Sequence, residues 1–186
     1  MHKETEEEHS EIKKSRLKDE VISWIQTIGA AAILAVCIVS FIIVNATVPT
    51  GSMENVIMPK DRIIALRLSY YFDVPERGDI AVFKFPDDET MLYVKRVIGL
   101  PGDTIEIKDG LVYINGDQTP LLEDYVKDEP IGNYGPYVVP EGHYFMMGDN
   151  RRWSQDSRFW TNKYVEEDKI LGKVYFRYWP NVEILK

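Results

Sequence analysis

Residues 21–53 read VISWIQTIGAAAILAVCIVSFIIVNATVPTGSM, and this stretch sets the organisation of the chain. It holds no charged residue, because the charges stop at Glu20 and resume at Glu54. Its apolar centre is residues 28–48. About 20 apolar residues in a helix that rises about 1.5 Å per residue cross the hydrocarbon core of a bilayer. The pattern predicts a transmembrane anchor over residues 21–48.

Two other interpretations of the apolar stretch compete with an anchor. Val44-Asn45-Ala46 has the small side chains of a signal-processing site, but the stretch is longer than the roughly 7–15 apolar residues of a secretory signal and its flank is of mixed charge. A helix buried in a soluble core would leave 33 uncharged residues for a small domain to cover on every side. The length therefore favours an uncleaved anchor.

Basic residues on either side of the anchor predict its orientation. Four precede it and three follow within a comparable distance: Lys13, Lys14, Arg16 and Lys18, then Lys60, Arg62 and Arg67. The positive-inside rule favours a cytoplasmic N-terminus by a narrow margin. We expect residues 1–20 to form a cytoplasmic tail, residues 21–48 a single span of the cell membrane, and residues 49–186 an extracytoplasmic domain.

The 138 residues from Pro49 to Lys186 have the texture of an all-β domain. Short alternating or β-branched runs recur, at residues 62–66, 79–85, 91–98, 104–107, 111–114, 143–147 and 174–179. Asp109-Gly110 and Asn115-Gly116 suit tight turns that need a positive φ. Outside the anchor, the best helical candidate is a short segment near residues 162–168. The predicted fold class is mainly β, with one N-terminal transmembrane helix.

The composition excludes several classes of function. The chain has 30 acidic and 22 basic residues and a formal charge of −8, which argues against a nucleic-acid partner. Its single cysteine, Cys37, cannot form an internal disulfide or a four-thiolate metal site, and its three histidines are scattered. We expect no metal and no cofactor.

Two residues of the β-domain are candidates for catalysis. Ser52 follows a glycine where the chain would leave the bilayer, although such a pattern is also common in ordinary turns. Lys95 interrupts the apolar run 91–98, and because side chains alternate along a strand, Lys95 and Arg96 point to opposite faces. One cation therefore faces inward whichever face is buried. The alternative is an edge strand whose lysine discourages aggregation.

A serine and a lysine can together perform nucleophilic catalysis. A serine hydroxyl becomes a good nucleophile when a base takes its proton, and a lysine amine can do so only if its pKa falls from about 10.4 toward the working pH. Burial among apolar groups can supply that shift, and Tyr93, Val94, Val97 and Ile98 flank Lys95. The polar loop at residues 147–159 could build hydrogen bonds around such an amine.

A set of ordered motifs carries a resemblance to a known family. They are Pro49-Thr50-Gly51-Ser52-Met53, Arg77-Gly78-Asp79-Ile80, residues 93–103 (YVKRVIGLPGD), and Gly148-Asp149-Asn150 with Ser154-x-Asp156-Ser157-Arg158. In this order and spacing they resemble the bacterial type I signal (leader) peptidases, from the anchor to the end of the chain. The acidic stretch 121–137 carries no family motif. The resemblance implies a membrane-bound serine endopeptidase, without metal or cofactor, that removes signal peptides from exported preproteins. The expected partners are these preproteins and membrane lipid, and we expect a monomer.

The resemblance also implies roles for individual residues. Ser52 matches the nucleophile of the family and Lys95 its general base. Thr50 matches the position whose hydroxyl, with the backbone N–H of Ser52, forms the oxyanion hole. Ser154 matches the serine that orients the lysine amine. The expected substrates have small side chains one and three residues before the scissile bond.

Two structural ion pairs are expected beside these residues. By the same resemblance, Asp156 supports the polar loop and pairs with Arg158, while Asp149 pairs with Arg96. Neither pair is expected to take part in proton transfer. The chain departs from many relatives at residues 54–55, where it reads Glu-Asn in place of Pro-Thr.

Hypotheses from two other classes compete with a signal peptidase. A membrane-tethered β-domain that only binds a protein partner would fit the composition and the anchor, but it gives no reason for Ser52, Lys95 and Ser154 to occur together. A serine–lysine self-cleaving repressor domain would share the chemistry. It would be expected to carry a DNA-binding helical domain in place of a membrane span.

Overall fold

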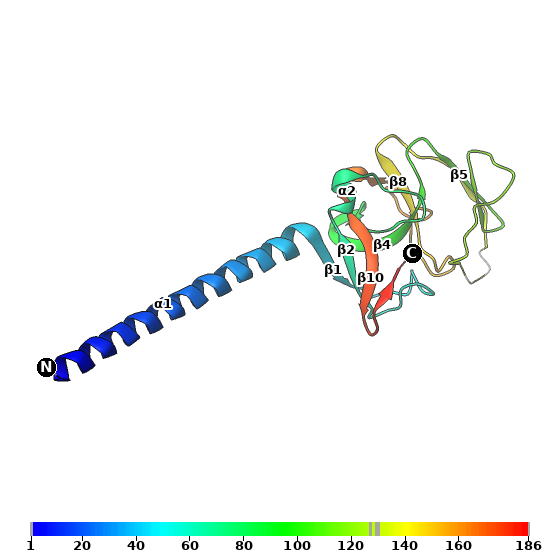
Figure 1. The fold of residues 1–186 in the computed structure, drawn as a ribbon. Coiled ribbons are helices and arrows are strands. Elements are labelled where there is room, and N and C mark those ends of the chain that lie inside the picture. Colours follow the sequence, from blue (N-terminus) through cyan, green and yellow to red (C-terminus); the bar gives the residue numbers. More distant parts are fainter. Residues whose placement is uncertain (1, 127, 129–130, 186) are drawn as a thin grey trace. The chain divides into compact units, whose positions relative to one another are not determined.

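The computed structural model describes residues 2–126, 128 and 131–185, and it divides into a helical unit that ends at Phe41 and a β-rich unit from Ile42 onward (Figure 1). Helix α1 (His2–Cys37) continues as a π-helical turn at Ile38–Ile42. Over the described part of the chain, the segment Arg16–Ile42 is the one helical stretch long and apolar enough to cross a membrane, and its side chains are not buried.

The apolar helix ends before the boundary predicted at residue 48. Strand β1 (Ile43–Thr47) follows directly and pairs antiparallel with β2 (Arg62–Leu66). Val44 is buried in the core of the β-rich unit. The apolar run alone does not mark this change, because Ile43 and Val44 suit a buried strand as well as an apolar helix.

The β-rich unit contains two antiparallel sheets. The larger has the strand order β1-β2-β10-β3-β4-β8-β9, with β11 paired to β10, and the smaller has the order β6-β5-β7. The other strands are β3 (Ile80–Phe85), β4 (Asp88–Gly99), β5 (Thr104–Lys108), β6 (Leu111–Ile114), β7 (Tyr134–Val138), β8 (His143–Met147), β9 (Val165–Glu166), β10 (Ile170–Trp179) and β11 (Glu183–Ile184). Helix α2 (Ser69–Phe72) and a 3-10 turn (Glu167–Lys169) complete the described elements. The predicted mainly β class is confirmed.

Most local expectations for the β-rich unit hold. Each of the seven runs identified in the sequence overlaps a strand. Asp109 and Gly110 both have positive φ and join β5 to β6 in a two-residue hairpin turn. Of the helix suggested near residues 162–168, only the 3-10 turn from Glu167 is formed, and it follows the short strand β9. Val165 in this segment belongs to strand β9 and pairs with Tyr144 of β8. Its apolar side chain is buried there.

Strand β4 is buried on both faces over residues 95–99. Its side chains contribute to three packed clusters, with Val94 against one, Val97 in the second and Ile98 in the third. Lys95 and Arg96 are therefore both buried, at 4% and 2% exposure. The sequence had required only one of these cations to face inward.

Candidate active site

Ser52 and Lys95 lie side by side in the β-rich unit. Lys95 Nζ is 2.5 Å from Ser52 Oγ, and Ser52 is 7% exposed. The buried half of β4 carries the lysine, while the serine begins a hydrogen-bonded turn in which the Ile57 N–H donates to the Met53 carbonyl over 2.8 Å. Met53 and Ile57 are fully buried and hold this turn against the core. The fold thus joins two candidates that are far apart in the sequence.

The amine of Lys95 is poised to lose its proton. Burial lowers the pKa of Lys95 to about 8, and the negative charges of Asp156 and Asp149 oppose part of that shift. Each of these carboxylates pairs with an arginine, Arg158 or Arg96, instead of the lysine. A neutral amine at hydrogen-bond distance from a hydroxyl can accept the hydroxyl proton. The arrangement can therefore generate a serine nucleophile near neutral pH.

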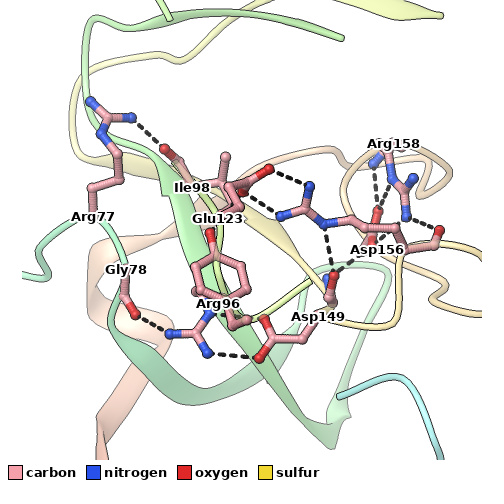
Figure 2. A network of polar contacts seen from close by, with 11 residues as sticks. Arg77, Gly78, Arg96, Ile98, Glu123, Asp149, Asp156 and Arg158 are labelled. Carbon is pink, nitrogen blue, oxygen red and sulfur yellow. Dashed lines mark hydrogen bonds and ion pairs between the residues drawn. The ribbon is translucent and has the colours of Figure 1, made fainter. Parts of the chain in front are cut away.

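The second cation of β4 is neutralised by a partner. Arg96 donates to both carboxylate oxygens of Asp149, over 2.8 Å and 2.7 Å, and to the Gly78 carbonyl over 2.6 Å (Figure 2). Such a bidentate pair compensates the burial of the guanidinium. Two adjacent residues of one strand thus differ, since Arg96 has a carboxylate partner and Lys95 has none among the described residues.

Asp156 and Gly148 fix the polar loop beside the serine. Asp156 accepts hydrogen bonds from Arg158 Nε over 2.8 Å and from the Gly148 N–H over 3.0 Å. A Cβ at position 148 would lie 2.2 Å from Ser154 Oγ and 2.4 Å from the Ser52 carbonyl oxygen. Only glycine fits this close approach, so the loop and the nucleophile turn are packed directly against each other.

One contact expected from the sequence is not formed. Ser154 Oγ is buried but has no hydrogen-bond partner among the described residues, so the orienting contact expected with Lys95 is not formed. Its hydroxyl is packed against Gly148 instead. Thr50 is exposed, and its Oγ1 lies 3.4 Å from Ser52 Oγ, at the long end of the hydrogen-bond range.

Asn150 is a residue of the site to which the sequence assigned no individual role. Its N–H donates to the Ser52 carbonyl over 3.1 Å, and its Nδ2 donates to the Gly51 carbonyl over 3.0 Å. The same Nδ2 donates to Glu54 Oε2 over 3.2 Å, so the departure from the family pattern at residue 54 supplies a further contact to the loop. Asn150 therefore clamps the turn that carries the nucleophile.

The two aspartates of the site, Asp149 and Asp156, are each paired with an arginine. Within the described ranges, no group of three or more His, Cys, Asp or Glu side chains could hold a metal ion. Asp149 and Asp156 each accept two hydrogen bonds from a guanidinium. These two carboxylates are therefore paired with guanidinium groups, while the Ser52 hydroxyl and the Lys95 amine contact each other.

Comparison with known proteins shows that this chain is similar to peptidases, and to one family of them in particular. Residues 21–179 match the model of the family described as signal peptidase, peptidase S26. The chain is 38% identical over 167 residues to a probable signal peptidase I-2 of Synechocystis, a match that covers 85% of this chain and 74% of that protein. It is 35% identical over 185 residues to signal peptidase I of Bacillus licheniformis, covering 95% and 98% of the two chains. The chain therefore belongs to the signal peptidase family, peptidase S26.

A solved structure is also similar to this chain. It is a crystal structure of a signal peptidase I from Enterococcus faecalis V583, at 34% sequence identity and a TM-score of 0.47. The match covers 54% of this chain and 97% of that one.

Proposed function

We propose that this chain is a membrane-bound serine endopeptidase that removes N-terminal signal peptides from exported preproteins, with Ser52 as nucleophile and Lys95 as general base. The observation that carries the proposal is the 2.5 Å separation between Lys95 Nζ and Ser52 Oγ in a buried setting. Membership of the signal peptidase family supports the substrate class. A tethered domain that only binds a partner would give no reason for this contact.

The first half-reaction transfers the signal peptide to the enzyme. The neutral amine of Lys95 takes the Ser52 hydroxyl proton as Oγ attacks the scissile carbonyl carbon. The Ser52 N–H and the Thr50 hydroxyl donate to the oxyanion that forms, and each donor of this kind is worth about 3–4 kcal/mol. The C–N bond then breaks, and the ammonium of Lys95 gives its proton to the departing amine of the mature protein. The signal peptide remains as an ester on Ser52.

The second half-reaction regenerates the enzyme. Lys95, neutral again, takes a proton from a water molecule whose oxygen attacks the ester carbonyl. The oxyanion collapses, the ester bond breaks, and Ser52 Oγ recovers its proton from the ammonium. Ser154 would hold the amine in line by turning its free hydroxyl toward Nζ once substrate is bound. Apo geometry is often looser than that of the substrate complex.

The apolar helix supports the proposal that this chemistry takes place at a membrane. We assign Arg16–Ile42 as a single span with the N-terminus cytoplasmic and the β-rich unit as an extracytoplasmic monomeric catalytic domain. Ser52 follows the helix by only ten residues, which keeps the nucleophile near the lipid surface where the cleavage region of a translocated preprotein emerges. The tether raises the effective concentration of the enzyme toward such substrates.

Cleavage of a preprotein by the full chain in detergent tests the proposal. The substrate carries small side chains one and three residues before the expected scissile bond, and N-terminal sequencing of the product locates the cut. We expect Ser52→Ala and Lys95→Ala to abolish cleavage. The matched controls Ser69→Ala and Lys84→Ala alter partly exposed residues outside the site and should retain activity. Retained cleavage in either site variant would contradict the mechanism.

A further inference from the structure

A segment without a family motif reaches the polar network beside the site. In residues 121–126 the side chains alternate, with Leu121, Glu123 and Tyr125 turned partly inward and Leu122 exposed. The Leu121 N–H donates to the Val112 carbonyl over 2.8 Å, which ties the segment to β6. An acidic loop with no other role would be expected to keep its carboxylates in solvent.

Glu123 instead forms a buried ion pair with Arg151. Its two carboxylate oxygens accept hydrogen bonds from the two terminal nitrogens of Arg151, over 2.7 Å and 2.5 Å, and the side chains are 9% and 1% exposed (Figure 2). The Tyr125 hydroxyl donates to the same carboxylate over 2.7 Å. The Tyr125 ring lies against the guanidinium of Arg96, with its centroid 3.9 Å from Cζ. The segment therefore contacts two arginines of the network.

Arg151 connects Glu123 to the centre of the site. Its Nε donates to the Gly148 carbonyl over 3.0 Å, while the N–H of the same glycine donates to Asp156. Both polar groups of Gly148 are thus held by charged side chains, and each of these has its own counter-ion. Gly148 in turn is the residue that is packed against the Ser52 carbonyl.

We propose that residues 121–126 form a brace for the active site, in which Glu123 is a positioning residue that acts through Arg151 on Gly148. The carboxylate holds the guanidinium in one orientation, the guanidinium holds the Gly148 carbonyl, and the glycine sets the position of the loop against the nucleophile turn. A buried guanidinium that loses its carboxylate turns toward solvent or another acceptor, since an unpaired buried charge is strongly disfavoured. Gly148 then loses one of its two attachments.

A double-mutant cycle tests this chain of contacts, and its kinetic readout rests on the proposed peptidase function. Glu123→Gln keeps the shape of the side chain but removes its charge. Displacement of a reacting group by about 1 Å costs about a hundredfold, so kcat should fall by about 10- to 100-fold with KM within about twofold. Arg151→Gln should cost at least as much. In the Arg151→Gln background, Glu123→Gln should cost nothing further, because the residue acts only through that arginine.

A stability-matched control separates positioning from general destabilisation. Ile107→Ala removes a buried side chain from the core of the smaller sheet and should lower Tm while leaving kcat unchanged. Amide hydrogen exchange over residues 147–158 adds a readout that needs no substrate, because the Asn150 N–H and the Ser157 N–H are hydrogen-bonded in the structure. Exchange there should accelerate in Glu123→Gln and stay unchanged in Ile107→Ala.

Each outcome of these measurements has a distinct meaning. A Glu123→Gln variant with a lowered Tm but wild-type kcat and wild-type exchange at residues 147–158 overturns the brace. Additive losses of kcat in the double variant also overturn it, because Glu123 would then act by a route other than Arg151. A wild-type chain that cleaves no preprotein contradicts the proposed function instead, and the exchange comparison still decides whether Glu123 holds the loop.

Discussion

Lys95→Met is expected to inactivate the protein and to stabilise it. Methionine is about as long as lysine and carries no charge, so it fits a position that is 4% exposed. Burial lowers the pKa of Lys95 from 10.5 to about 8. A lysine whose pKa falls on folding has an ammonium form that the folded state destabilises. Burying the Lys95 ammonium therefore lowers the stability of the fold, and the substitution removes this penalty.

The size of the effect follows from the pKa shift. One pKa unit corresponds to about 1.4 kcal/mol, so the fall from 10.5 to about 8 destabilises the ammonium form by about 3 kcal/mol. At pH 7 the lysine is protonated in the unfolded chain and largely so in the folded one, so the wild type bears nearly the whole cost. The lost hydrogen bond to Ser52 offsets about 1 kcal/mol. Lys95→Met should therefore be more stable by about 2 kcal/mol at pH 7.

The sign of this difference should reverse at high pH. Between about pH 8 and 10.5 the unfolded wild type binds more protons than the folded wild type, so wild-type stability rises with pH. Above that range the lysine is neutral in both states and the burial cost is gone. Only the lost hydrogen bond then remains, and Lys95→Met should be less stable than the wild type by about 1 kcal/mol.

Thermal unfolding of the full chain in detergent, followed by tryptophan fluorescence, measures both effects. A gain of about 2 kcal/mol corresponds to a Tm rise of roughly 4–8 °C for a chain of this size. Lys84→Met is the control for the same chemical change at a less buried position, because Lys84 lies on β3 with a side chain that is 41% exposed. If Lys95→Met has the wild-type Tm or a lower one at pH 7, or a Tm difference that does not shrink as the pH rises, the assignment of Lys95 as a buried base of lowered pKa is refuted.

Three further predictions follow from the same contacts. Gly148→Ala should lower kcat by about a hundredfold, because its Cβ would lie 2.2 Å from Ser154 Oγ and 2.4 Å from the Ser52 carbonyl oxygen; near-wild-type turnover would show that the loop can give way. Asp149→Asn should destabilise the fold by about 3–5 kcal/mol in denaturant titrations, since it leaves Arg96 buried without a counter-ion, and a loss under 1 kcal/mol would contradict this. The value of kcat/KM should rise with pH through about 8 as the base loses its proton, and a pH-independent profile between 6 and 9 would exclude that base.

Local patterns in the sequence predict most of the strands but not their neighbours. Alternating runs and Asp-Gly or Asn-Gly turns depend on residues close together in the chain, and they place β5 and β6 correctly. Whether a strand is covered on one face or both depends on elements that are distant in the sequence. The alternation of side chains along β4 therefore predicts that one of Lys95 and Arg96 faces inward. In the structure both are buried, because other elements pack on both faces of β4.

Chemical type, likewise, predicts which residues matter better than it predicts their contacts. A serine and a lysine of the right kind were found from the sequence, and the structure places them 2.5 Å apart. The family resemblance implies a role for Ser154 as well, but its hydroxyl has no hydrogen-bond partner among the described residues. A side-chain rotation is enough to make or break such a contact, and no sequence pattern encodes a rotation.

The polar network shows which part of the missing information could have been inferred. The motifs contain the carboxylates Asp149 and Asp156, and these are matched by Arg96 and Arg158. A further buried arginine in the same loop would need a carboxylate from outside the motifs, since an unpaired guanidinium is too costly to bury. This need for a carboxylate could not be inferred from the sequence alone. The sequence has arginine at both positions 151 and 152, and it does not indicate which of the two is buried.

The structure resolves that choice and makes the requirement specific. The Arg151 side chain is 1% exposed, whereas Arg152 is exposed. The partner of Arg151 lies 28 positions earlier, in an acidic stretch that resembles a solvated loop when it is considered alone. A buried arginine requires a carboxylate close by to compensate its charge. Glu123 is that carboxylate, and both of its oxygens accept hydrogen bonds from Arg151. A segment without a motif can therefore belong to an active site because the motif leaves a charge that only that segment neutralises.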